Sequence, residues 1–451
     1  MFKIYQAVFF SYLFILLGSV CYSNEKKNFI ILFADDLGPL HLGYKDNNFH
    51  TPNIDLLKME SLYFPRAYIA SPSCSPSRAT LVTGRHPAAI KMTRHIPGDK
   101  KYGFDENHVT DQEFNLFGRG KTKFPSRNWL PLNEITYAET LQSIGYHNVF
   151  VGKWHLGSEE YHPEHQGFDE TLFVNNFGHP ESYYSPSFKN SKQTEKGYLT
   201  DHLTNQTVNW IENYDQKKPF QLSLFYYSAH DPFIGRKDLV KRYKSKGFNG
   251  NNAEYMAMVT CIDESVGRIR NSLTKKGIDK NTVLIFLSDQ SSKIPNGKLR
   301  GKKLKETLYE GGSNIPFLIY DPKSNSAGKE NLSLVQSTDI FPTLIDLAGH
   351  DSNQYQHLHG KSLFPLIQGE ETLARDSIFA YRTYSDEYAT VHFKQWKLIA
   401  FRNKKRELYH LKNDPYEQND LSKNKPEIVE NLNSQLKNWE IKMGVHHENN
   451  F

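Results

Sequence analysis

Continuous runs of apolar residues recur along the chain and predict buried β-strands. The runs do not alternate with polar residues, which is typical of parallel strands covered on both faces. Stretches with helical periodicity, two of them ended by Gly145 and Gly277, separate the runs. The predicted strands are 29–34, 149–151, 220–227, 282–287 and 315–320, and the predicted helices are 136–144, 252–275 and 339–347. This alternation predicts an α/β fold with a large, mostly parallel sheet sandwiched by helices.

The pattern changes after about residue 370. Two short aromatic segments, 390–393 and 396–400, predict an antiparallel meander, and a polar helix is expected over 426–443. We therefore predict a large α/β domain over 24–370 and a smaller C-terminal α+β subdomain with an antiparallel sheet over 371–451. Residues 96–130 show no clear period and are predicted to form a long loop beside the functional site.

The N-terminus has the pattern of a secretory signal peptide. Lys3 is the only charged residue in 1–23, an apolar stretch covers 7–17, and small residues stand at 21 and 23. The apolar stretch is shorter than the ~20 residues that a membrane-spanning helix needs. We expect cleavage after Ser23, export to the periplasm or the medium, and no integral membrane span in the mature chain. The alternatives are a membrane anchor and a lipid anchor at Cys21.

Composition excludes several classes of protein. With 28 Gly and 21 Pro among 451 residues, the chain is neither collagen-like nor a low-complexity linker. Three Cys are too few for a disulfide framework. Lys and Arg number 55 against 50 Asp and Glu, so the chain lacks the basic excess of nucleic-acid-binding proteins.

Polar residues follow several predicted strands at their carboxyl ends, the edge where open α/β sheets bind ligands. These residues are Asp35-Asp36, Lys153-Trp154-His155, His230 and Asp289-Gln290. Three carboxylates and an amide oxygen suit calcium or magnesium better than zinc, which prefers His and Cys. The alternative is structural, with Asp35 capping a turn and Asp289 as an ordinary loop carboxylate.

The segment 74–85, CSPSRATLVTGR, predicts a short helix that begins at Cys74. Pro76 suits the first helical turn, and Gly84 suits the position where a helix ends. Cys74 would then lie at a helix N-terminus, which favours an anion, with Arg78 about one turn further on. The alternatives for Cys74 are a buried free thiol and a disulfide with Cys261.

With these residues the chain resembles the formylglycine-dependent (type I) sulfatases of the alkaline phosphatase superfamily. The C-x-P-S-R core and the L-x-T-G-R tail are complete in 74–85. The resemblance covers nearly the whole mature chain and includes Asp35-Asp36, G-K-W-H-L-G at 152–157, G-F-D at 167–169, the H-x-P histidine His230, S-D-Q at 288–290, Y-E-G-G at 309–312 and D-P at 414–415. It implies an alkaline-phosphatase-like fold.

The resemblance also implies the chemistry. A separate formylglycine-forming maturation enzyme would oxidise Cys74, and the hydrated aldehyde would attack the sulfur of a sulfate ester. One calcium ion would stabilise the developing charge. The implied calcium ligands are Asp35, Asp36, Asp289, Gln290 and the converted Cys74.

Further roles follow from the same resemblance. Arg78 and Lys153 would stabilise the nucleophile and the transferring group, and His155 would be the base that releases sulfate. His230 and one lysine would contact the sulfate and protonate the leaving oxygen. Counting back from Tyr309 places that lysine at Lys305, which we choose, whereas counting on from Arg300 gives Lys303. Gln290 departs from the Asn or His that is commoner in the family, and Asn314 stands where Arg is frequent.

These observations predict an exported sulfuric-ester hydrolase that acts on a sulfated carbohydrate, such as a fragment of ulvan, carrageenan or a glycosaminoglycan. A phosphatase or phosphodiesterase of the same superfamily is the alternative, although those relatives usually offer Ser or Thr as nucleophile. A third possibility is an inactive binding protein that keeps the fold. Weaker candidates for sugar or sulfate contacts are Arg94-His95, Arg119, Arg382-Thr383-Tyr384 and the basic run 293–305.

Overall fold

The computed structural model describes residues 26–115, 125–188, 196–215, 217–383 and 385–445. The predicted signal peptide, with Cys21, lies outside these ranges, as do Arg119 and Tyr384. Among the helices within them, none is both long enough and apolar enough to cross a bilayer.

A seven-stranded sheet forms the centre of the molecule. Its order is β2 (Leu62–Tyr63), β10 (Phe317–Tyr320), β9 (Thr282–Ser288), β1 (Asn28–Ala34), β8 (Phe220–Phe225), β6 (His147–Lys153) and β7 (Glu170–Asn175). Strands β9, β1, β8, β6 and β7 run parallel, whereas β10 is antiparallel to β9 and β2 is antiparallel to β10. Each predicted strand therefore lies in this sheet, and the mostly parallel architecture is confirmed.

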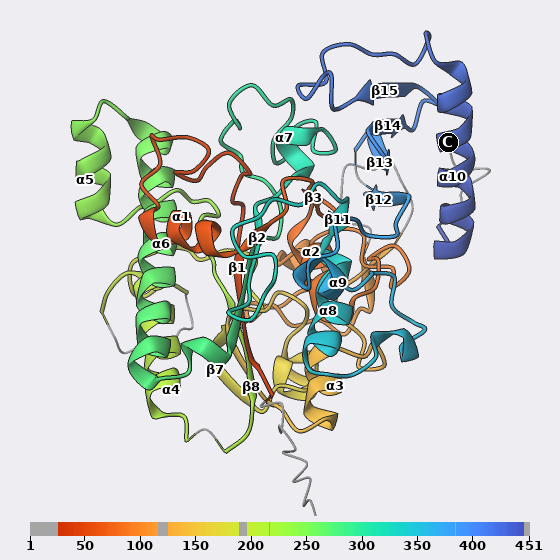
Figure 1. Ribbon diagram of the computed structural model, residues 1–451. Helices are drawn as coiled ribbons and strands as arrows, with labels where there is room; N and C mark the ends of the chain where they lie inside the picture. The colour runs from red at the N-terminus through yellow and green to blue at the C-terminus, as the bar shows by residue number, and fades with distance from the viewer. Residues whose placement is uncertain (1–25, 116–124, 189–195, 216, 384, 446–451) are drawn as a thin grey trace, which may run out of the picture.

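Helices cover both faces of the sheet (Figure 1). On one face lie α1 (Pro52–Glu60), α4 (Leu199–Asn213), α5 (Lys237–Ser245) and α6 (Gly250–Lys276); on the other lie α2 (Cys74–Thr83), α3 (Tyr137–Ser143), α8 (Ile340–Leu347) and α9 (Phe364–Ile367). Within β1, Phe29, Ile31 and Phe33 pack against the second layer. Ile30 and Leu32 pack against the first. Because the side chains on both faces of β1 are buried, its sequence is a continuous apolar run.

The C-terminal region forms its own small sheet. Strands β12 (Ser377–Tyr381), β13 (Glu387–Phe393), β14 (Trp396–Phe401) and β15 (Arg406–His410) pair in sequence order and antiparallel. Helix α10 (Pro426–Met443) packs Leu432, Leu436 and Met443 against this sheet. The predicted meander and helix are confirmed, and the domain boundary at 370 stays a prediction.

Short elements complete the fold. Strands β3 (Ala67–Tyr68) and β11 (Val335–Gln336) form a parallel pair. The region 96–130, predicted to be a loop, contains a 3-10 turn at Lys100–Tyr102 and the antiparallel pair β4 (Phe114–Asn115) and β5 (Ser126–Arg127).

A buried group of three charges joins the main domain to the C-terminal sheet, and we call it the junction triad. Lys397 of β14 places its Nζ 2.8 Å from Glu310 Oε1, on the short helix α7 (Glu310–Ser313), and 2.8 Å from Glu417 Oε1. The Tyr68 hydroxyl donates to Glu310 Oε2 (3.0 Å), and the Glu310 N–H donates to Glu417 Oε2 (2.7 Å). Burial raises the pKa of Glu417 to about 7.

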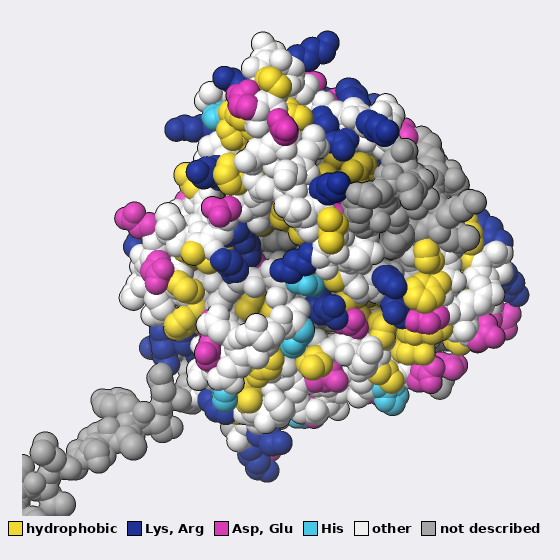
Figure 2. All heavy atoms as spheres, turned by 90° about the vertical axis from the view of Figure 1, so that its right-hand side faces the viewer, with side chains coloured by type: hydrophobic (Ala, Val, Ile, Leu, Met, Phe, Trp, Pro, Cys, Tyr) yellow, Lys and Arg dark blue, Asp and Glu magenta, His cyan; other side chains and the backbone are white. Residues whose placement is uncertain are grey.

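Figure 2 shows the face of the molecule that lies on the right in Figure 1. Lys and Arg side chains gather near the middle of this face, next to several His side chains, around a hollow. Such a surface attracts anions.

Candidate active site

The register of the main sheet brings two acidic strand ends together. Ala34 at the end of β1 pairs with Ser288 at the end of β9, so Asp35 and Asp289 leave the sheet side by side. The Asp289 N–H donates to Ala34 O (3.0 Å) and extends the ladder by one bond. Both carboxylates are fully buried.

The end of β6 adds a lysine to the same edge. Gly152 pairs with Phe225 of β8 at φ 93°, and a Cβ there would lie 2.2 Å from Phe225 O. Only glycine allows this approach. Lys153 follows, fully buried, and its Nζ contacts Asp35 Oδ2.

Asp36 carries an unpartnered acceptor. Its backbone has φ 58°, a left-handed conformation that is uncommon for a non-glycine residue, and its N–H donates to Asp289 Oδ1 (3.0 Å). Its Oδ2 lies 2.5 Å from Lys303 Nζ, whereas its buried Oδ1 has no hydrogen-bond partner. Native proteins seldom leave a buried carboxylate oxygen unpaired unless it serves a ligand.

Helix α2 begins at Cys74 and ends at Thr83, as predicted, with Gly84 in the left-handed conformation. The Cys74 thiol accepts a hydrogen bond from Gln290 Nε2 (3.1 Å) and lies 3.9 Å from Asp35 Oδ1. Burial raises the pKa of this thiol to about 12. Cys74 and Cys261 are both free, so the alternative of a disulfide between them is wrong.

The Arg78 guanidinium lies beside the carboxylates of Asp35 and Asp289. Its side chain is fully buried, and its NH1 donates to Lys153 O (2.7 Å). Its NH2 lies 3.4 Å from Asp289 Oδ2 and 3.5 Å from Asp35 Oδ2. The guanidinium also stacks near the rings of Phe33 and Phe225, at 5.4 and 5.5 Å. Arg78 therefore fixes the positions of the Asp35 and Asp289 carboxylates, a contact that the motif alone did not reveal.

The structure places Lys303, rather than Lys305, beside the acidic residues. A tight turn, with hydrogen bonds between Lys302 and Lys305, leaves the Lys305 side chain exposed. The same turn directs Lys303 inward, where its side chain is 8% exposed and pairs with Asp36. Counting back from Tyr309 leads to the exposed lysine because the turn between Arg300 and Tyr309 reverses the chain.

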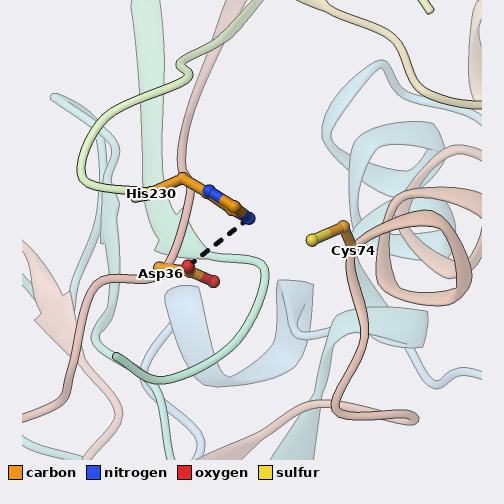
Figure 3. A group of neighbouring side chains, drawn as sticks. All are labelled: Asp36, Cys74 and His230. Carbon is orange, nitrogen blue, oxygen red and sulfur yellow. Dashed lines mark ion pairs between the residues drawn. The ribbon is translucent and has the colours of Figure 1, made fainter. Parts of the chain in front are cut away.

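Two buried histidines come from different loops, and His230 faces the acidic group. The His230 Nε2 lies 3.8 Å from Asp36 Oδ2, and Figure 3 shows this ring, the Asp36 carboxylate and the Cys74 thiol directed into one space. His155 donates from Nε2 to Ile96 O (3.0 Å), and the Ile96 N–H donates to Ser75 Oγ (3.0 Å) in the first turn of α2. His155 Nδ1 is buried without a partner.

The surroundings shift the pKa values of the three carboxylates in different directions. Burial alone would raise the pKa of Asp35, but the cations Lys153 and Arg78 outweigh it and lower that pKa. Burial raises the pKa of Asp36 to about 6 despite Lys303. Burial and the charge of Asp35 hold the pKa of Asp289 well above its usual value. Crowded carboxylates of this kind are stabilised by a cation.

These residues fit a hard divalent cation. Ligand atoms of Asp35, Cys74 and Asp289 lie within 4.8 Å of one another, as do those of Asp36, Cys74 and His230. The oxygen donors and the unpartnered Asp36 Oδ1 match the preference of calcium or magnesium. The Gln290 side chain reaches the same space through its contact with Cys74.

Other candidates lie around this centre. Arg94 is buried and donates to Asn115 O (2.7 Å). Burial, with Lys303 nearby, lowers the pKa of His95 to about 3. Sequence reasoning missed His179, whose ring stacks on His230 with centroids 5.7 Å apart. A histidine shortly after the end of β7 was the signal that could have found it.

Two protein-family models match this chain. The family model described as Sulfatase matches residues 27–350. The one described as N-sulphoglucosamine sulphohydrolase, C-terminal, matches residues 302–442. Together they span both the main sheet and the C-terminal sheet.

Individual relatives also match this chain over most of its length. The N-acetylgalactosamine-6-sulfatase of Mus musculus is 30% identical over 392 residues, which cover 79% of this chain and 69% of that protein. The N-acetylglucosamine-6-O-sulfatase of Bacteroides thetaiotaomicron is 24% identical over 503 residues, 88% of this chain and 83% of that protein. The crystal structure of Ps i-CgsB in complex with k-i-k-neocarrahexaose has a TM-score of 0.78 at 27% identity and covers 92% of this chain and 93% of its own. The implied fold class is thereby confirmed.

Proposed function

Because the chain belongs to the sulfatase family and is therefore a sulfuric-ester hydrolase, we propose that it is an exported enzyme that removes sulfate from a sulfated carbohydrate. The observation that carries the proposal is the convergence of Asp35, Asp36 and Asp289 on Cys74 at the start of α2. The N-terminus of this helix favours the sulfate group.

The proposed cofactors are one calcium ion and a formylglycine made from Cys74 by a maturation enzyme. Calcium would supply a Lewis acid, and formylglycine would supply the hydrated aldehyde as nucleophile. The residues that would hold calcium are Asp35, Asp36, Asp289, Gln290 and the converted Cys74. The unpartnered Asp36 Oδ1 supports this set, and the position of His230 makes its Nε2 a neighbour of the ion.

The cationic side chains hold the anionic group. Lys153 and Lys303 lie on opposite sides of the acidic pair, one at Asp35 and one at Asp36. Their ammonium groups would bind sulfate oxygens, while Arg78 keeps the carboxylates in position from below. Lys303, and not Lys305, takes the role of the lysine that contacts sulfate. Fixed charges in a buried site stabilise a transition state without reorganisation.

Two histidines would move protons. His155 donates from Nε2 to a carbonyl, so in the neutral ring Nδ1 carries the lone pair. This unpartnered nitrogen is the proposed base for sulfate release. His230 directs Nε2 between Asp36 and Cys74 (Figure 3). Its Nδ1 faces the carbonyl of Asp231 and carries the hydrogen of the neutral ring, so Nε2 would donate a proton to the leaving oxygen from the protonated ring.

Several observations support a carbohydrate substrate. Two relatives are named for the 6-sulfates of amino sugars, and a third was solved with a carrageenan-type hexaose. The face in Figure 2 gathers Lys, Arg and His side chains, which suits a polyanion. Export with loss of residues 1–23 fits an enzyme that acts on extracellular polysaccharide, and a mature N-terminus at Asn24 would test it.

The experiment measures sulfate release from aryl sulfates, amino-sugar 6-sulfates and oligosaccharides of carrageenan, ulvan and glycosaminoglycans, and phosphate release from aryl phosphates. The protein is co-produced with a formylglycine-forming enzyme and assayed with calcium, and conversion of Cys74 is checked by peptide mass. We expect sulfate release that falls at least about a thousandfold in Cys74→Ala. Cys261→Ala is the matched control, because that cysteine is also buried and free. Phosphate release without sulfate release would replace the proposal with a phosphatase of the same superfamily.

A further inference from the structure

The segment that follows β7 covers both histidines of the site. The His179 ring stacks on the His230 ring, with centroids 5.7 Å apart and planes 13° from parallel. One residue earlier, Gly178 lies on His155, where a Cβ would come within 2.9 Å of Cε1. The segment 177–179 therefore forms the next layer of the site beyond the two histidines.

This segment is firmly held. Asn175 Oδ1 accepts hydrogen bonds from the Phe177 N–H (3.0 Å) and the Tyr227 hydroxyl (2.6 Å). The Phe177 ring packs against the rings of His108 (4.2 Å) and Phe188 (5.4 Å). A side chain carried on such a support is pre-organised to bind a ligand.

His179 presents two features to a ligand. Its side chain is exposed, and since one ring face stacks on His230, the opposite face is turned away from the site wall. Its Nδ1 lies 3.1 Å from Pro180 O, which can only accept, so Nδ1 carries the hydrogen and Nε2 the lone pair. The ring thus combines a flat apolar face with one acceptor.

We propose that the segment 177–179 forms the subsite for the sugar ring that bears the sulfate ester, and that His179 is a specificity-determining residue. A sulfur atom near Cys74 with its leaving oxygen at His230 would place the attached sugar beyond that oxygen, and His179 is the exposed side chain that stacks on His230. His179 Nε2 accepts a hydrogen bond from a ring hydroxyl, and its outer face packs against ring C–H groups. The inference rests on the proposed carbohydrate substrate.

Binding without turnover tests the inference. In the Cys74→Ala background, calorimetry measures the Kd of N-acetylgalactosamine 6-sulfate, N-acetylglucosamine 6-sulfate and a carrageenan hexasaccharide. We expect His179→Ala to weaken the best of these about tenfold and His179→Gln, which keeps an acceptor, to recover part of the loss. The exposed His350→Ala is the matched control. In the converted enzyme, His179→Ala should lower kcat/KM for that sugar sulfate about tenfold relative to kcat/KM for 4-nitrophenyl sulfate, chiefly through KM.

Three outcomes would overturn the inference. An unchanged Kd for His179→Ala would rule out the proposed subsite but would not affect the proposed function. An equal loss on the sugar and aryl substrates, expressed in kcat, would mean that His179 only positions His230. If Cys74→Ala bound none of the saccharides while the converted enzyme cleaved 4-nitrophenyl sulfate, the carbohydrate substrate itself would fail, and the subsite with it.

Discussion

The active site and the junction triad both bury lysines against carboxylates, but they differ in what is left unpaired. In the junction triad, Lys397 lies between Glu310 and Glu417, and a hydroxyl and an N–H bind the outer oxygens. Glu417 Oε1 has no hydrogen-bond partner but keeps its ion pair with Lys397. In the active site, Asp36 Oδ1 and His155 Nδ1 are buried without partners.

This difference distinguishes buried charges that hold the fold together from buried charges that bind a ligand. A buried ion group that satisfies itself holds two parts of the chain together, although it is weak evidence of stability. A buried group whose unpaired atoms converge on one space is built for a ligand. Burial of charge alone would not have distinguished the two regions.

The largest expected effect comes from breaking the junction triad. Lys397→Met leaves two buried carboxylates without their shared cation, and we expect the free energy of unfolding to fall by about 3 kcal/mol. Urea unfolding measures it. Lys412→Met, at an exposed lysine close to β15, is the control. A loss below about 0.5 kcal/mol would mean that the triad does not hold the junction.

The corresponding lysine of the active site should affect turnover instead. Lys303→Met is expected to lower kcat/KM for sulfate release about a hundredfold, which equals ~2.7 kcal/mol. Lys305→Met is the matched control, because this lysine lies two residues away and is exposed. Equal losses in the two variants would contradict the placement of Lys303.

Calcium should stabilise the protein through the active site and not through the junction triad. With free calcium at about ten times its Kd, we expect ~1.4 kcal/mol of added stability, seen as a rise in Tm that a chelator reverses. Asp36→Asn should abolish this rise, because it changes the carboxylate with the unpartnered oxygen. Glu310→Gln in the junction triad should lower Tm but keep the calcium-dependent rise. If Asp36→Asn kept the full rise, calcium would bind elsewhere.

A pH dependence of stability is expected from Glu417. Its pKa is raised from 4.5 to about 7, so between these values the native state binds more protons than the unfolded state. Stability from this group is therefore lost as pH rises from 4.5 to 7, by about 1 kcal/mol per pH unit at most. Glu417→Gln should flatten the stability profile in this window, whereas the exposed Glu430→Gln should not. An unchanged slope in Glu417→Gln would assign the dependence to another group.

Local patterns were enough to predict five strands of the main sheet, several helices and the polar residues at the strand ends, but they did not predict β7 or α4. The apolar run 29–34 became β1 with Asp35 and Asp36 at its end, and α2 begins at Cys74. Such features depend on burial periodicity and on residues that start or stop a helix, which a single sequence displays directly.

Three features required the folded chain. The inward direction of Lys303 depends on a reversal between Lys302 and Lys305, which spacing from a motif does not encode. The stacking of His179 on His230 joins the loops after β7 and β8, two strands that are separated by β6 in the sheet. Arg78 meets Asp35 and Asp289 only because β1 and β9 pair in one register.

The sequence by itself therefore determined which elements form and which kinds of side chain stand at their ends, because burial and helix boundaries are local properties. The tertiary structure decided which atoms meet and which stay unpaired, because strand order, register and turn direction are set by packing between distant segments.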